Sequence, residues 1–78
     1  MEKFTVEVGT TGTVAQGEVT VVDVPARFVA NLVLPGHREP AWVGEGECFA
    51  AGETLVELVE VGTHSVTFEI VDPDDEWG

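Results

Sequence analysis

The feature that most restricts the fold of this chain is a two-residue alternation of apolar and polar side chains, interrupted at short intervals by glycine. Residues 4–8 and 65–70 show the alternation most clearly. This is the period of a β-strand with one buried face and one face in water. Turn signals about 8–12 residues apart are typical of small sandwiches and barrels. We therefore expect an all-β domain over residues 1–71, an antiparallel barrel or sandwich of six to seven short strands.

The clearest local unit is a C-terminal hairpin over residues 54–71. Thr54 to Val61 and Ser65 to Val71 flank a turn at Gly62, and the second segment alternates cleanly. A second hairpin is predicted nearer the N-terminus, where Gly9 and Gly12 allow a tight reversal that would pair residues 4–8 with 13–15.

Two places between these hairpins depart from simple alternation. The pattern slips at Val21-Val22, which predicts a β-bulge or a strand that is buried on both sides. Residues 25–34 fit either a short helix over 25–33, because Pro25 suits a first helical turn, or a strand that ends at Pro35-Gly36. The abundance of valine favours the strand.

Residues 43–58 resemble the hammerhead segment of biotinyl and lipoyl carrier domains, through Val43-Gly44-Glu45-Gly46-Glu47, Ala51-Gly52 and Leu55-Val56-Glu57-Leu58. The resemblance implies a strand, a turn and a second strand. In that family the next turn presents a lysine that is modified, whereas residues 60–63 contain none, so the resemblance does not imply a carrier function.

Charge excludes several classes of partner. The 78 residues carry 15 Asp and Glu against three Lys and Arg, a formal charge of −12. Binding to nucleic acid needs cations that neutralise phosphates, so we expect no direct nucleic-acid or membrane partner. Disorder is also disfavoured, because 44% of the residues are hydrophobic. The acidity has two compatible explanations: the codon bias of a GC-rich genome, or halophilic adaptation to a high-salt interior.

Catalytic, metal and cofactor sites are not expected. Cys48 is the only cysteine, so it forms no internal disulfide, and we predict that it is buried as a small apolar side chain. No nucleophile stands in a motif with His37 or His64. Residues 72–76 begin like a calcium loop, but the glycine and the closing glutamate of such a loop are missing. We therefore predict a protein that is not an enzyme.

The candidate contact residues lie in two places. Residues 72–78 form an acidic tail in which Trp77 follows Asp74, Asp75 and Glu76, the composition of a segment that docks into a pocket. Trp77 folding back on its own domain is the alternative. Trp42 follows the loop 35–40, which carries His37 and Arg38, and core packing is the alternative for this tryptophan.

A core this small has little stability of its own, so contact with other subunits is expected. The sequence predicts a protein partner or a homo-oligomer, and a structural or accessory subunit of a larger assembly such as a virion or a multimeric complex. The alternative is an acidic inhibitor that mimics nucleic acid and blocks a basic DNA- or RNA-handling protein. No signal peptide or transmembrane segment is evident, so a cytoplasmic or virion location is expected.

Overall fold

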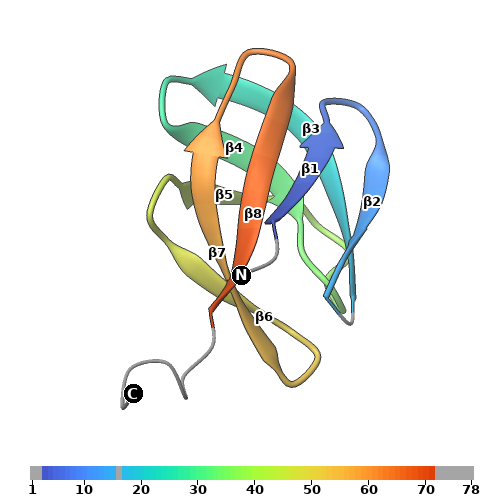
Figure 1. Cartoon of the computed structure of the whole chain (residues 1–78). Helices are drawn as coiled ribbons and strands as arrows, with labels where there is room; N and C mark the ends of the chain where they lie inside the picture. Colours follow the sequence, from blue (N-terminus) through green and yellow to red (C-terminus); the bar gives the residue numbers. More distant parts are fainter. Residues whose placement is uncertain (1–2, 16, 72–78) are drawn as a thin grey trace.

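The computed structural model describes residues 3–15 and 17–71, which fold into two four-stranded antiparallel sheets (Figure 1). Sheet A has the strand order β1-β8-β7-β6 and sheet B the order β2-β3-β4-β5. The strands are β1 Lys3–Glu7, β2 Thr11–Val14, β3 Gly17–Ala26, β4 Val29–Val33, β5 Ala41–Gly44, β6 Cys48–Ala51, β7 Thr54–Val61 and β8 Ser65–Val71. The all-β prediction is confirmed, with eight strands instead of six to seven.

The described chain winds once around its core. Consecutive strands are neighbours within each sheet, and the chain passes between the sheets only from β1 to β2 and from β5 to β6. The first and last strands then pair with each other, from Lys3 opposite Glu69 to Glu7 opposite Ser65 (Figure 1). The sheets face each other as a sandwich and do not close into one barrel.

The predicted hairpin between residues 4–8 and 13–15 is wrong, although the predicted turn exists. Gly9 has a φ of 86° there. Val8 N–H donates to the carbonyl of His64 in the β7–β8 turn of sheet A (2.9 Å), whereas Gly9 N–H donates to the Val21 carbonyl of sheet B (2.7 Å). The corner therefore sends β1 and β2 into different sheets. Alternation reports which side chains are buried, but it does not identify the strand that supplies the hydrogen bonds.

Residues 25–34 contain no helix, so the helix alternative for residues 25–33 is wrong, but the predicted strand is divided by a turn into the end of β3 and β4. β3 continues to Ala26, and a two-residue turn leads into β4 at Val29. The bulge predicted at Val21-Val22 is confirmed, because the register shifts between Val21 and Asp23. A second shift between Asp23 and Ala26 accommodates Pro25, which has no N–H for the ladder.

The core lies between the two sheets and is entirely hydrophobic among the described residues: Val6, Val14, Val19, Val21, Ala30, Leu32, Val43, Phe49, Ala51, Val56, Leu58, Val66 and Phe68. The hairpin predicted over 54–71 is confirmed as β7 and β8, and β6 and β7 form the strand-turn-strand unit that the resemblance implied. Cys48 is exposed on the edge strand β6, so the prediction that it is buried is wrong.

Candidate functional site

The outer face of sheet B carries an exposed tryptophan. Trp42 on β5 lies opposite Asn31 on β4, which in turn lies opposite Asp23 on β3. Neighbouring residues of a strand point to opposite sides of the sheet. Because Val43 is buried in the core, the Trp42 side chain points away from it, and Trp42 is 69% exposed. Core packing, the alternative for Trp42, is therefore wrong.

Valines surround this tryptophan. The bulge in β3 leaves both Val22 and Asp23 exposed, so Val22 reaches water although it follows the buried Val21. Val29 and Val33 are partly buried on β4, where they alternate with the fully buried Ala30 and Leu32. We call the set Val22, Val29, Asn31, Val33 and Trp42 the Trp42 face. The charged side chain next to this set is Asp23, which is exposed and lies opposite Asn31.

Asn31 occupies the middle of the Trp42 face. Its Oδ1 atom is buried and has no hydrogen-bond partner among the described residues. A buried acceptor without a partner costs roughly 1–3 kcal/mol, so an apolar residue would serve the stability of β4 better at this position. The residue type is therefore not explained by the stability of the isolated domain.

Phe28 is a second exposed aromatic residue that sequence reasoning missed. It sits in the turn between β3 and β4 with a φ of 65°, a conformation rare for a bulky side chain, and 59% of it is exposed. Its carbonyl accepts a hydrogen bond from Glu45 N–H (2.7 Å), which ties the turn to the end of β5. Phenylalanine next to valines in a strand-forming segment gives no sequence signal of an exposed turn.

Beside Phe28 the turn between β3 and β4 approaches the turn between β7 and β8, and the two enclose a shallow groove of about 430 Å³. Its walls are mostly apolar and include one cation. The lining residues are Val24, Ala26, Arg27, Phe28, Val61, Gly62 and Thr63. We call it the end groove.

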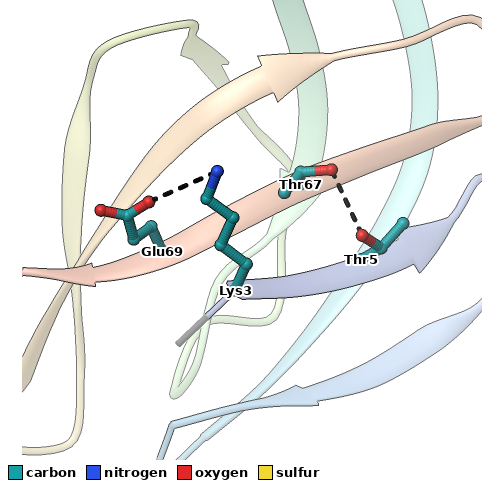
Figure 2. Close-up of polar contacts among 4 residues, drawn as sticks. All are labelled: Lys3, Thr5, Thr67 and Glu69. Carbon is teal, nitrogen blue, oxygen red and sulfur yellow. Dashed lines mark hydrogen bonds and ion pairs between the residues drawn. The ribbon is translucent and has the colours of Figure 1, made fainter. Parts of the chain in front are cut away.

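The outer face of sheet A differs from that of sheet B in its charge. Glu69 lies between Lys3 on β1 and Glu57 on β7, in a row that continues to Cys48 on β6. The Lys3 Nζ atom lies 3.9 Å from Glu69 Oε2, and the hydroxyl oxygens of Thr5 and Thr67 are 3.3 Å apart. Figure 2 shows the two pairs between the neighbouring strands β1 and β8. We call the set Glu7, Glu57, Glu60 and Glu69 the acidic face.

The other predicted contact residues are less informative. His37 and Arg38 are exposed in the loop between β4 and β5, where His37 N–H closes a turn on the Leu34 carbonyl (3.0 Å). Trp77, Asp74, Asp75 and Glu76 lie outside the described residues. The structure thus places Trp42 on β5, directly after the loop that carries His37 and Arg38.

Within residues 3–15 and 17–71, no three side chains of the His, Cys, Asp or Glu types gather closely enough to hold a metal ion. The same residues contain no helix with the length and apolarity needed to cross a membrane. Comparison of the chain with protein-family models, with curated proteins and with solved structures found no match.

Proposed function

We propose that this chain is a non-catalytic module that acts by protein contact, as a structural or accessory subunit of a larger assembly. The observation that carries the proposal is the Trp42 face, on which a tryptophan that is 69% exposed lies beside valines on the outer side of sheet B. Tryptophan is enriched among the residues that dominate binding energy at protein interfaces. An aromatic residue in water contributes little to the stability of its own domain.

The distribution of exposed apolar side chains supports this choice of face. Among the described residues, the exposed large hydrophobic side chains are Val22, Phe28, Trp42 and Leu55. The first three belong to sheet B or to its β3–β4 turn, whereas only Leu55 lies on sheet A. The unpartnered Asn31 Oδ1 adds a polar group on the same face whose presence the isolated domain does not explain.

Site-directed photo-crosslinking tests the proposal in the cells that express the chain. The crosslinking residue is placed at position 22, which leaves Trp42 intact, and in a control at position 55. Val22 and Leu55 are 42% and 44% exposed, so the two probes are equally accessible. We expect a covalent protein adduct of one discrete mass from position 22 and none from position 55. Equal labelling at both positions, or none at either, would contradict the proposal.

A second candidate function, an acidic inhibitor that mimics nucleic acid, is favoured by a different observation. Glu57 and Glu69 are directly opposed across β7 and β8, and opposed side chains have Cβ atoms about 4.5–5.5 Å apart. Glu60 and Glu7 extend the negative charge over the acidic face. Such a face would attract a basic groove, and its binding would weaken steeply with added salt.

The two candidates predict opposite mutational results. A double Glu57→Gln, Glu60→Gln variant should lose retention on an immobilised basic nuclease if the mimic hypothesis is right, whereas Trp42→Ala should not. Retention that does not fall as salt rises would eliminate the mimic.

A further inference from the structure

We propose that the protein partner of the Trp42 face presents an arginine side chain, which binds across the row formed by Trp42, Asn31 and Asp23. The inference rests on the protein-contact function proposed above and states the chemistry of the partner. Three features of the described residues support it: an exposed aromatic ring, an acceptor without a hydrogen bond and a carboxylate without an ion pair.

The three side chains lie in one row across sheet B. Trp42 on the edge strand β5 is opposite Asn31 on β4, and Asn31 is opposite Asp23 on β3. Neighbouring strands are about 4.8 Å apart, so the row is roughly 10 Å long. The bulge in β3 exposes Asp23 on the same side of the sheet as Asn31. A head group that lies over Asn31 is therefore within reach of both of its neighbours.

Asn31 lacks a hydrogen-bond donor in the isolated domain. Its Oδ1 atom is buried without a partner among the described residues, although the side chain as a whole is partly exposed. Rotation about the Cβ–Cγ bond exchanges the amide oxygen and nitrogen and turns the oxygen outward. A partner that donates a hydrogen bond to this oxygen removes the cost of leaving it unpaired. Asn31 therefore favours a ligand with N–H groups over an apolar ligand.

Asp23 determines the sign of the ligand's charge. It is exposed, and no cation of the described residues pairs with it, whereas Glu69 on the acidic face has Lys3 beside it. Glu18, at the start of β3, adds a second negative charge to the outer side of sheet B, and Arg27 lies in the end groove instead. The formal charge of −12 also attracts cations from a distance. The face therefore complements a positively charged side chain.

Arginine fits the row better than lysine. Its planar guanidinium stacks on an indole ring, and its N–H groups can donate to an amide oxygen and a carboxylate at the same time. Trp42 is 69% exposed at the edge of the sheet, so its ring is free to cover a guanidinium that lies over Asn31. The apolar stem of the arginine contacts the valines of the Trp42 face, which are Val22, Val29 and Val33. A lysine ammonium is a strongly hydrated point charge and loses the stacking.

An NMR titration of the isotope-labelled full chain with Nα-acetylarginine amide tests the inference. The controls are Nα-acetylcitrulline amide, which has nearly the same shape without the charge, and Nα-acetyllysine amide. The arginine probe should shift the signals of the Trp42 indole and the Asn31 side-chain amide in a saturable way. The dissociation constant should be at least about twofold higher for the lysine probe, and the citrulline probe should not saturate.

Variants of the chain identify the contacts. Trp42→Ala and Asp23→Asn should each raise the dissociation constant about two- to fivefold, the loss of one exposed cation–π contact or ion pair. Glu57→Gln removes the same charge from the acidic face and should change it less. Asn31→Leu should weaken arginine binding without lowering the urea midpoint, because leucine leaves no acceptor unpaired. A lower midpoint would show that Asn31 serves the stability of β4 instead.

Several results would overturn the inference. These are no saturable shift, equal affinity for the arginine and lysine probes, signals around Glu57 that shift as much as those of the Trp42 face, or an Asn31→Leu variant that binds as the wild type does. An adduct from position 22 without the arginine preference would refute arginine as the contact while the protein-contact function stands. Arginine binding without an adduct would indicate a site for free guanidinium compounds and refute the protein partner. If neither is found, both proposals are refuted.

Discussion

The rings of Phe49 and Phe68 meet edge to face, with centroids 5.7 Å apart and an interplanar angle of 88°. This pair joins the edge strand β6 to the central strand β8 inside the core, and Phe68 is the largest of the fully buried side chains. It is therefore the single side chain on which the core depends most.

Truncation of this ring should unfold the domain. Phe68→Ala removes a buried aromatic at a cost of about 3–5 kcal/mol, comparable with the roughly 3–5 kcal/mol that a core of this size supplies. Circular dichroism at 25 °C should show loss of the β-sheet signal. Phe68→Leu should remain folded with a lower urea midpoint, and Leu55→Ala should change the midpoint little because its side chain is partly exposed. A folded Phe68→Ala would show that the core is not organised around this ring.

A glycine determines how closely the two sheets approach at the β1–β2 edge. A Cβ on Gly12 would lie 2.6 Å from Val6 Cγ2. Gly12→Ala should therefore lower the free energy of unfolding by about 1–3 kcal/mol, measured by urea denaturation. Val6→Ala removes the methyl groups that clash, so the double variant should be more stable than the sum of the two single effects predicts. Additive losses would mean that the two positions do not touch.

Electrostatic repulsion across β7 and β8 should limit stability. Glu57 lies opposite Glu69, and like charges at opposed positions destabilise a sheet by a few tenths of a kcal/mol up to about 1. Glu57→Gln should raise the melting temperature more than Glu7→Gln, because Glu7 lies opposite the uncharged Ser65. Molar salt should raise the melting temperature of the wild type and reduce the difference between the variants. A wild-type melting temperature that does not change with salt would show that self-repulsion is unimportant.

The sequence predicted the fold better than the site, and the reason is physical. Alternation within Thr54–Val61 and Ser65–Val71 reports which side chains avoid water, so these strand bounds agree with β7 and β8. The pairing of β1 with β8 instead of β2 depends on contacts far apart in the chain, which local patterning does not encode.

For the candidate surface, too, local patterning predicted some features, whereas others depended on how distant strands pair. The bulge that exposes Val22 was visible as a slip in the alternation, but its consequence for the outer face required the register of β4. Trp42 was recognised as a contact candidate, and its exposure depends on the direction in which β5 presents it. Phe28 was missed because its hydrophobicity predicts burial, whereas its backbone lies in a turn.

Phe28 combines a strained backbone with an exposed side chain, and the strain can be measured separately from the exposure. The residue is second in the two-residue turn between Ala26 and Val29, and its φ of 65° is one that glycine adopts without steric cost. Phe28→Gly should therefore raise the free energy of unfolding by about 0.5–1 kcal/mol, less than the roughly 1–2 kcal/mol of strain because glycine also loses more entropy on folding. Phe28→Ala keeps the Cβ and the strained conformation, so it should not be stabilised. If urea denaturation gives the same midpoint for both variants, the turn is not strained and the phenylalanine needs no explanation beyond its own packing in the end groove.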